Sequence, residues 1–506
     1  MSNTQPARRL NLLCALAIAS AATLSGCSWL KHDAESLSYV GAENISDREK
    51  GIPTENTERE GPTWSLETLQ AAENALAQPP LSFEHAWYLA VKNDPAYQAA
   101  LSGRAAAQIE RQLGRAAILP QVQAGYSRRK ITGLQRNFTA LGTSEGELSY
   151  DSTSTYIQLQ QPLFNVDRYA QYKRGQARAQ LGEAEFAVME YEAAMRLVKA
   201  YLEVVRAQGR TRLSQLLVDS LEEQARTQAT LYELNEASSV DAQETEARLA
   251  IARADLIAAE DMLKVARRHL QSLIGEDTPE LGNIDTLNPA ALVAESGGLV
   301  GWLEKASANS ATIRRAHANV RVADTEVQRA VGRHLPTADL VVSWVDADSE
   351  NLETLSQASN TFQAGVQVNI PIFSGGYDTA NHARSRHLRR QAEQELVQAE
   401  EVVAAEITRQ FTAVEGGALR IEALESSVES AEQSLEAAKR GYEFGVNSNL
   451  DVLRRQDRLF QARFELLEAR VTWIDAYASL AAAAGEPVWA VVTALDNAIG
   501  PASGRR

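Results

Sequence analysis

Histidine and carboxylate side chains could build a metal site or a hydrolytic site, but their spacing here supports neither. The seven histidines include no pair at i and i+4 and no carboxylate spacing typical of zinc hydrolases. The sequence has no Gly-x-Ser-x-Gly motif, no phosphate-binding glycine-rich loop and no dinucleotide-binding fingerprint. We therefore expect no enzyme activity, no metal and no cofactor. The histidines are His32, His85, His269, His317, His334, His382 and His387.

Two aspartates are more informative because they occupy matching places in two similar stretches. Residues 441–453 read GYEFGVNSNLDVL and residues 231–243 read LYELNEASSVDAQ, so that Asp451 matches Asp241 at an offset of 210. Gly445 can adopt the left-handed conformation that ends a helix, and Asn235 is the next most tolerant residue type. Each stretch is therefore interpreted as a turn between two helices. The alternative for both aspartates is an ordinary solvated position on a helix surface.

Residues 1–27 have the pattern of an export signal. Arg8 and Arg9 precede an apolar run that ends in Leu24-Ser25-Gly26-Cys27. This ending resembles the bacterial lipoprotein box, in which Cys27 becomes the lipid-bearing first residue of the mature chain; the alternative is a plain secretory signal with an incidental cysteine. Only Cys14 and Cys27 exist, so the mature chain has no disulfide. Residues 28–80 are expected to form an extended N-terminal tether.

Composition excludes several classes of protein. The chain has 506 residues, of which 44% are hydrophobic and 23% charged, so disorder throughout is excluded. The formal net charge of -16 argues against a nucleic-acid partner, because phosphate binding needs a basic face. After the signal, no run approaches the length of about 18 apolar residues that a membrane-spanning helix needs, so any passage through a bilayer would have to be made by strands.

The chain carries two copies of one series of landmarks, in the same order, at offsets of 209 to 216 residues. Such an internal repeat implies two tandem structural repeats. The matched pairs are Leu119-Pro120 with Leu335-Pro336, Pro162-Leu163-Phe164 with Pro371-Ile372-Phe373, Tyr232 with Tyr442, and Gly275-Glu276 with Gly485-Glu486. We expect repeat 1 at 81–275, a linker at 276–300, repeat 2 at 301–485 and a C-terminal tail at 486–506.

Each repeat contains two segments in which polar and apolar residues alternate, as in a strand with one polar face. The four strands are expected at about 121–130, 154–162, 337–346 and 361–370, joined in pairs by polar loops at about 131–152 and 347–360. About ten residues suffice to cross a bilayer when a strand is tilted. A half-buried sheet of a soluble protein alternates in the same way. The long helices that flank both pairs of strands favour the interpretation that the strands cross a membrane.

Long stretches without proline follow each pair of strands and have apolar residues at helical spacing. In the first, Met195, Val198 and Leu202 step by 3 and 4. Since a return helix follows each stretch, we expect helical hairpins at 166–274 and 377–484. Gly416-Gly417 in the second predicts a local bend or a close helix approach, unless it is a tolerated weak point.

Four strands are too few to close a cylinder, and an open edge in hydrocarbon leaves backbone groups unpaired at several kcal/mol each. The chain must therefore form an oligomer. Eight strands from two copies would leave an interior filled by side chains, whereas twelve strands from three copies would leave a lumen that suits the polar face.

The sequence resembles the TolC family of outer-membrane channel proteins, in its lipoprotein branch. The resemblance lies in the tandem repeats with their Leu-Pro landmarks, in Pro-Ile-Phe-Ser-Gly-Gly at 371–376 and in the stretch at 441–453, and it covers about 81–486. It implies an α+β membrane protein, a homotrimer whose twelve-stranded transmembrane β-barrel is continued by a long periplasmic α-helical barrel. The linker 276–300 and the tail 486–506 would form an equatorial collar.

The resemblance also implies roles for the two repeated stretches. The turns would be hairpin tips that contact a periplasmic adaptor protein; the tip residues are Asn235, Glu236, Gly445 and Val446. Asp241 and Asp451 match residues of a periplasmic constriction, where like charges from three chains raise one another's pKa and favour cations. This chain departs from the family pattern, because Arg454 stands in place of a second carboxylate and a basic residue expected near Asn447 is missing. Arg454 could pair with Asp451 at i+3 and partly neutralise the constriction.

The function implied is a passive outer-membrane exit duct of a tripartite efflux system. Its partners would be an adaptor (membrane fusion) protein, an inner-membrane pump of the RND, MFS or ABC type, and outer-membrane lipid. The chain would be lipid-anchored in the outer membrane with a long periplasmic portion. One alternative is a type I protein secretion channel, and the sequence does not decide the cargo. An alternative of another class is a lipid-anchored coiled-coil scaffold without a pore.

Overall fold

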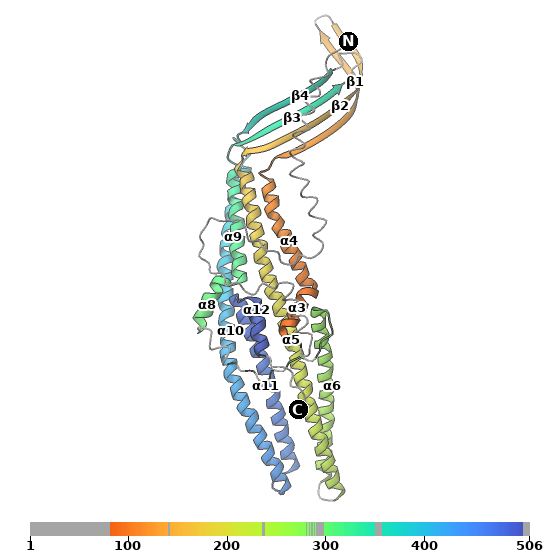
Figure 1. Ribbon diagram of the computed structural model, residues 1–506, viewed down its shortest axis with the longest axis vertical. Coiled ribbons are helices and arrows are strands. Elements are labelled where there is room, and N and C mark those ends of the chain that lie inside the picture. The colour runs from red at the N-terminus through yellow and green to blue at the C-terminus, as the bar shows by residue number, and fades with distance from the viewer. Residues whose placement is uncertain are drawn as a thin grey trace. The chain divides into compact units, whose positions relative to one another are not determined.

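The computed structural model describes residues 81–498, without 140–141, 235–237, 280, 283, 285–286, 288, 290–297 and 350–356. Two successive series of elements run along the chain (Figure 1). The first contains α3 (Phe83–Asn93), α4 (Pro95–Ala116), β1 (Gln121–Thr139), β2 (Gly142–Phe164), α5 (Val166–Glu233) and α6 (Ser239–Ile274). The second contains α8 (Gly298–Asn309), α9 (Ala311–Gly332), β3 (Thr337–Ser349), β4 (Gln357–Asn369), α10 (Tyr377–Glu443) and α11 (Asn449–Ala484), and α12 (Val488–Ala498) follows. Among these residues, no helix combines the length and the apolar character needed to cross a membrane. The expected signal, Cys27 and the tether 28–80 lie outside the described residues.

The described chain divides into two compact units, one with residues 109–179 and 321–391 and the other with residues 81–108, 180–320 and 392–498. The first unit contains the sheet. Its strands lie in the order β1-β2-β3-β4, and every neighbouring pair is antiparallel (Figure 1). Within the described residues, β1 and β4 are therefore edge strands, each with one side unpaired.

The register of the sheet separates apolar from polar side chains. Residues directly opposite one another on neighbouring strands share a face of the sheet, and successive residues along a strand alternate between faces. One row that crosses all four strands is Val122, Leu159, Val342 and Ala364, and the row two residues along is Ala124, Ile157, Trp344 and Phe362. The row between them, on the opposite face, is Gln123, Gln158, Ser343 and Gln363. The sheet thus has an apolar face and, over these positions, a face of amides and hydroxyls.

The strands extend beyond the ranges expected from the sequence. A polar loop was expected at about 131–152, but β1 and β2 pair without interruption from Gln121 opposite Gln160 to Thr139 opposite Gly142. The ladder continues because its backbone hydrogen bonds do not depend on side-chain polarity. Opposite charges also meet across it, since Arg128 and Asp151 lie 2.8 Å apart. Likewise, β3 extends to Ser349 and β4 begins at Gln357, inside the loop expected at about 347–360.

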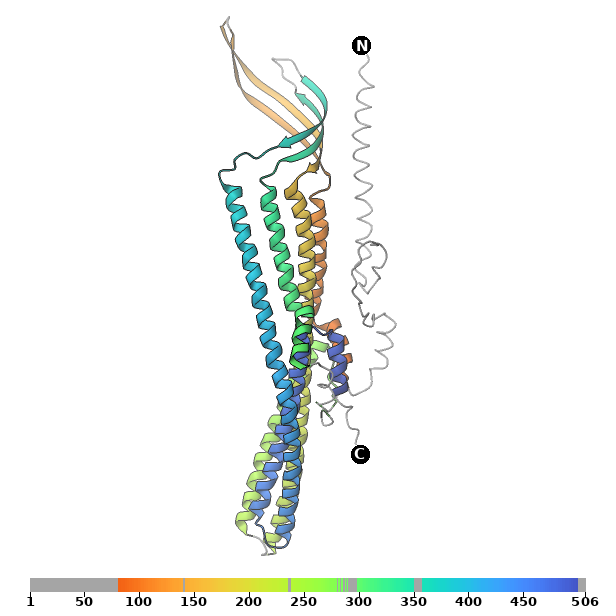
Figure 2. The ribbon, with the colours of Figure 1, turned by 90° about the vertical axis from the view of Figure 1, so that its left-hand side faces the viewer.

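The second unit contains α5 from residue 180 onward, α6, α10 from residue 392 onward, and α11. Helices α3 and α12 pack beside them (Figure 2). Its core includes Tyr201 of α5, which is 1% exposed and donates its hydroxyl hydrogen to the Leu81 carbonyl at 2.8 Å. The backbone N–H of Glu84 at the start of α3 donates to Asp496 of α12 at 2.9 Å. Burial raises the pKa of the Asp496 carboxyl. This contact ties the C-terminal helix to the first described helix.

The glycine pair in α10 lies against α11. A Cβ atom at Gly417 would be 2.9 Å from Trp473 Cδ1, whereas one at Gly416 would meet nothing within 4 Å. Trp473 is 1% exposed, and its Nε1 donates to the Val414 carbonyl of α10 at 2.9 Å. The expected close helix approach is therefore present at Gly417, where only a residue without a side chain leaves room for the indole.

Candidate functional site

The residues singled out in the sequence lie at two turns of the second unit, one between α5 and α6 and one between α10 and α11. Asn235 and Glu236 fall outside the described residues. The remaining residues, Asp241, Gly445, Val446, Asn447, Asp451 and Arg454, are all described. The geometry below therefore concerns the second turn and the first residues of α6.

The turn after α10 ends the helix through Gly445. Its φ of 70° is the left-handed conformation that glycine adopts without strain, as its position in the sequence predicts. The N–H groups of Val446 and Asn447 both donate to the Gly441 carbonyl, at 2.7 and 3.1 Å. The Asn447 side chain donates to the Ala438 carbonyl at 3.3 Å. Asn447 thus satisfies a carbonyl at the end of α10, and Val446, which is 80% exposed, forms the tip.

Asp451 belongs to a capping box at the start of α11. The backbone N–H of Asp451 donates to Ser448 Oγ at 3.2 Å, and the backbone N–H of Ser448 donates to Asp451 Oδ2 at 3.1 Å. The Ser448 hydroxyl also donates to the same carboxylate oxygen at 2.6 Å. These hydrogen bonds from Ser448 hold the pKa of the Asp451 carboxyl below its usual value, and the charge of Arg454 adds a smaller lowering.

Asp241 lies in the first turn of α6, after the N-cap residue Ser238. Its backbone carbonyl accepts a hydrogen bond from Thr245 Oγ1 at 2.8 Å and another from Asn449 Nδ2 at 3.3 Å. The second bond comes from the first residue of α11. The structure therefore brings the two repeated stretches together through the backbone of Asp241 and the side chain of Asn449.

A buried polar cluster surrounds Asn449, whose side chain lies between the two helical hairpins and is only 2% exposed. Its Nδ2 donates to Thr245 Oγ1 at 3.0 Å, and its Oδ1 accepts from Gln224 Nε2 at 2.8 Å. Gln228 Nε2 donates to the same Oδ1 at 3.3 Å and to the Tyr442 hydroxyl at 2.7 Å. The cluster thus contains groups from α5, α6, α10 and α11.

An ion pair joins the hairpins beside this cluster. Arg248 of α6 donates to Asp457 of α11 and also to Glu244 Oε1 at 2.9 Å. Each hairpin has its own ion pair as well, from Arg253 to Glu222 at 2.8 Å in the first hairpin and from Arg463 to Glu432 at 2.6 Å in the second. The contact between Arg248 and Asp457 therefore joins the first hairpin to the second.

The sequence reasoning missed most of this arrangement. It did not single out Gln224, Gln228, Thr245, Arg248, Asn449 and Asp457. One signal was available, since Asn449 and Gln456 are polar residues on the same buried stripe of α11 as Val452 and Leu453. A polar residue at such a position predicts a partner, although not its identity. Within the described residues, no group of three or more His, Cys, Asp or Glu side chains could hold a metal ion.

Comparison with known proteins gives consistent matches over both halves of the chain. The family described as "Outer membrane efflux protein" matches residues 86–276 and 302–486. The chain is 32% identical over 410 residues to "Proteases secretion protein PrtF" of Dickeya chrysanthemi, covering 79% of this chain and 87% of the relative. It is 29% identical over 407 residues to "Alkaline protease secretion protein AprF" of Pseudomonas aeruginosa, covering 79% of this chain and 83% of the relative. The crystal structure of the outer membrane protein VceC from Vibrio cholerae has the same fold, with a TM-score of 0.66 at 17% identity over 80% of this chain and 96% of that one.

Proposed function

Because the chain belongs to the outer membrane efflux protein family, we propose that three copies of it form a passive exit duct. The protein lies in the outer membrane and has a long periplasmic part. Solutes leave through the lumen of the trimer, and the chain itself performs no reaction. The two series of elements act as tandem repeats, so that each copy supplies four strands and two helical hairpins.

The sheet is the observation that carries the proposal. Its apolar face suits lipid, its polar face suits a water-filled lumen, and both edge strands have an unpaired side. Four strands are too few for a closed barrel, whereas three copies supply about twelve, enough for an open lumen. On the apolar face of β4, Val366 is 59% exposed and Val368 is 60% exposed in the single chain. Such exposure is expected for a face that lipid covers.

The turns form the periplasmic end of the duct. We assign contact with an adaptor protein to the tip residues Asn235, Glu236, Gly445 and Val446, since Val446 and its neighbour Phe444 are about four-fifths exposed. Asp241 and Asp451, with Arg454 and Asn447 nearby in the sequence, line the constriction.

An inner-membrane pump of the RND, MFS or ABC type supplies the energy. A lipid on Cys27 anchors each chain.

A type I protein secretion channel is the second candidate, and the names of two relatives favour it. PrtF and AprF are both described as protease secretion proteins, and they are 32% and 29% identical to this chain. In that case the cargo is a polypeptide and the pump is an ABC transporter. The two candidates share the duct and differ in what passes through it.

The duct is tested by planar-bilayer recording on the full-length protein purified in detergent. We expect trimers that conduct ions, and we expect replacement of Asp241 and Asp451 by alanine to raise the conductance and weaken the cation preference. A chain that stays monomeric and soluble without detergent would instead be a scaffold. Unchanged conductance and ion preference in the double variant would remove the two aspartates from the constriction and leave the duct itself in place.

The cargo is tested in a strain that lacks the gene. Loss of a secreted polypeptide from the medium, with no change in the accumulation of a fluorescent dye, would establish protein secretion. The opposite result would establish efflux of small molecules.

A further inference from the structure

Helices α4 and α9 are equivalent parts of the two series of elements, and so are α5 and α10. Helices α4 and α9 begin and end at an offset of 216 residues, and α5 and α10 end at Glu233 and Glu443, an offset of 210. The second offset also matches two buried residues, Gly175 of α5 and Ser385 of α10. Each residue of one helix therefore has a defined equivalent in the other series.

Within one chain, α5 and α9 pack side by side in the first unit (Figure 2). A Cβ atom added at Gly332 of α9 would lie 2.6 Å from the backbone nitrogen of Asp167 in α5. Arg174 of α5 lies 2.8 Å from Glu326 of α9. Arg329 of α9 lies 3.4 Å from Asp167. The contact between α5 and α9 thus combines a close backbone approach with two ion pairs.

The equivalent faces of α10 and α4 are exposed in the single chain. Helix α4 precedes the edge strand β1 and α10 follows the edge strand β4, so these two helices stand at the ends of the row (Figure 2). Thr325, on the α9 face towards α5, is 7% exposed, whereas its equivalent Ile109 of α4 is 44% exposed. Ala170 of α5 is 2% exposed, whereas its equivalent Ala380 of α10 is exposed. Faces that are buried in one pair of helices are therefore open in the other pair.

The two open faces carry opposite charges at matching places. The equivalent of Glu326 on α4 is Glu110, and the equivalent of Arg174 on α10 is Arg384, which is exposed. Glu110 also lies 3.8 Å from Arg178 of its own chain, just as Glu326 lies 3.2 Å from a second arginine of its own chain. A carboxylate and a guanidinium thus stand where the chain has its 2.8 Å ion pair.

The second ion pair is replaced by apolar residues. Leu113 stands in the place of Arg329 and is 59% exposed, and Tyr377 stands in the place of Asp167 and is 62% exposed. The guanidinium of Arg333 lies 6.0 Å from the centre of the Tyr377 ring, which leaves most of that side chain uncovered. Exposed apolar side chains at matching positions favour a protein surface that covers both, and another copy of this chain supplies it.

We propose that α10 of one copy packs against α4 of the next copy in the way that α5 packs against α9 within a chain. Arg384 pairs with Glu110 of the partner subunit, and Tyr377 packs on Leu113 of the partner subunit. Since the two faces are different surfaces of one unit, the contact is heterologous and generates a ring, here of three copies. This inference rests on the proposed trimer and names the residues that hold neighbouring copies together.

The first test is a disulfide between copies of the full-length protein in detergent. Ala116 is the equivalent of Gly332, which approaches Asp167 closely within the chain. The pair Ala116→Cys with Tyr377→Cys should therefore cross-link neighbouring copies into covalent trimers. The control pair uses Thr379→Cys in place of Tyr377→Cys, because a residue two positions along a helix points to the other side, and it should not cross-link.

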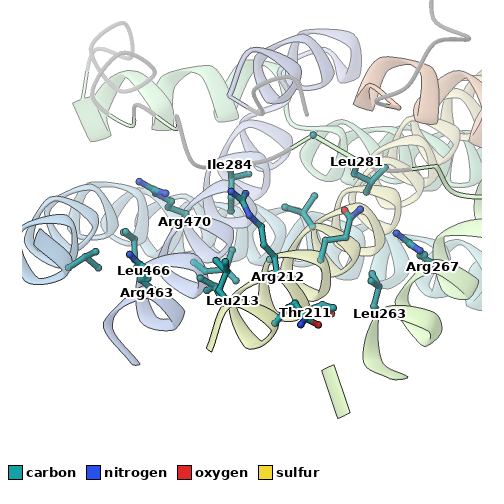
Figure 3. Close-up of a pocket in the computed structure, with 18 residues that line it drawn as sticks. Thr211, Arg212, Leu213, Leu263, Arg267, Leu281, Ile284, Arg463, Leu466 and Arg470 are labelled. Carbon is teal, nitrogen blue, oxygen red and sulfur yellow. The ribbon is translucent and has the colours of Figure 1, made fainter. Parts of the chain in front are cut away.

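The second test reverses the charge of the ion pair. Arg384→Glu places a carboxylate against Glu110 of the partner subunit and should raise the concentration of monomer at equilibrium about tenfold, which corresponds to about 1.4 kcal/mol. The double variant Arg384→Glu with Glu110→Arg should recover only part of this loss, because the new arginine lies beside Arg178. Two controls should leave the monomer concentration unchanged. They are Arg386→Glu on the same helix and Arg267→Glu on the wall of a cavity of about 770 Å³ in the second unit (Figure 3).

The outcomes separate this contact from the proposed duct. Trimers that form but do not cross-link through positions 116 and 377 would overturn the contact and leave the duct in place. The same conclusion would follow if the Thr379→Cys control cross-links equally well, or if Arg384→Glu and Arg386→Glu have equal effects. A protein that stays monomeric in detergent would overturn the proposed trimer and this contact together.

Discussion

Asn449 Nδ2 donates a hydrogen bond to Thr245 Oγ1 at 3.0 Å, which joins the first residue of α11 to the second turn of α6. Both residues are almost fully buried, with 2% and 0% exposure. They belong to different helical hairpins, 204 positions apart in the chain. A duct that opens by separating its hairpins at the turns has to break this bond and those around it. Asn449 is therefore the residue whose replacement should most directly favour the open arrangement.

Replacement of Asn449 by leucine should destabilise the packed turns by about 1–3 kcal/mol, because Thr245, Gln224 and Gln228 would lose a buried hydrogen-bond partner. We expect a lower thermal unfolding midpoint and a higher resting conductance. The matched control is Gln461→Leu on the exposed side of α11, whose effect should stay within about 0.5 kcal/mol. Equal behaviour of the two variants would show that the buried cluster does not hold the hairpins.

The ion pair between Arg248 and Asp457 should respond to charge reversal. Arg248→Glu places a carboxylate against Asp457 and Glu244, so we expect the hairpins to separate and the resting conductance to rise. The double variant Arg248→Glu with Asp457→Arg should recover part of the wild-type value, since it restores the attraction to position 457 and leaves the repulsion from Glu244. Since Asp457 is half exposed, the pair contributes about 1 kcal/mol or less, and its effect should shrink at high salt. If the double variant has the same resting conductance as the single variant, attraction between residues 248 and 457 is not what holds the hairpins together.

The sequence predicted the local features of this protein better than its contacts. The hairpins expected at 166–274 and 377–484 coincide with the outer ends of the helix pairs α5/α6 and α10/α11, because proline-free stretches with apolar residues at helical spacing are local signals. Gly445 was placed correctly for the same reason. Strand ends were predicted poorly, because the ladder from Ile131 to Tyr150 continues through residues whose side chains suggested a loop.

In the candidate site too, local features were predictable from the sequence and long-range contacts were not. The pattern Ser448-x-x-Asp451 is itself the signal of a capping box, because the residues that form it are separated by only three positions in the chain. The partners of Asn449 could not be predicted in this way. Gln224 and Thr245 lie more than 200 positions away, and nothing near them in the sequence marks them as neighbours of α11. Long-range pairing depends on the packing of the hairpins, which periodicity alone does not specify.

Asp451 should make the start of α11 sensitive to acid. Its pKa in the folded chain is below the unfolded value of about 3.9, so its stabilising effect is complete above that value and is lost as the pH falls through the lower, folded pKa. We expect Asp451→Asn to speed amide hydrogen exchange in the first turn of α11 at pH 7. Below the folded pKa the variant and the wild type should exchange alike. The control is Ser448→Ala, which removes the N-cap oxygen and should speed exchange both at pH 7 and below the folded pKa. If the effect of Asp451→Asn is the same at both pH values, the carboxylate charge is not what stabilises the turn.

The glycine pair in α10 offers a comparison in which neighbouring substitutions have opposite signs. Gly417→Ala would place a methyl group against Trp473, whose indole is fixed by its bond to the Val414 carbonyl, so we expect a loss of about 1–3 kcal/mol from overpacking. Gly416→Ala meets open space and should stabilise the helix by about 0.5–1 kcal/mol, since alanine loses less conformational entropy than glycine. Chemical denaturation of the two variants measures both changes. If the clash with the indole causes the loss, a combined variant, Gly417→Ala with Trp473→Leu, should recover part of the lost stability. Equal destabilisation by Gly416→Ala and Gly417→Ala would instead indicate that α10 needs flexibility at this point.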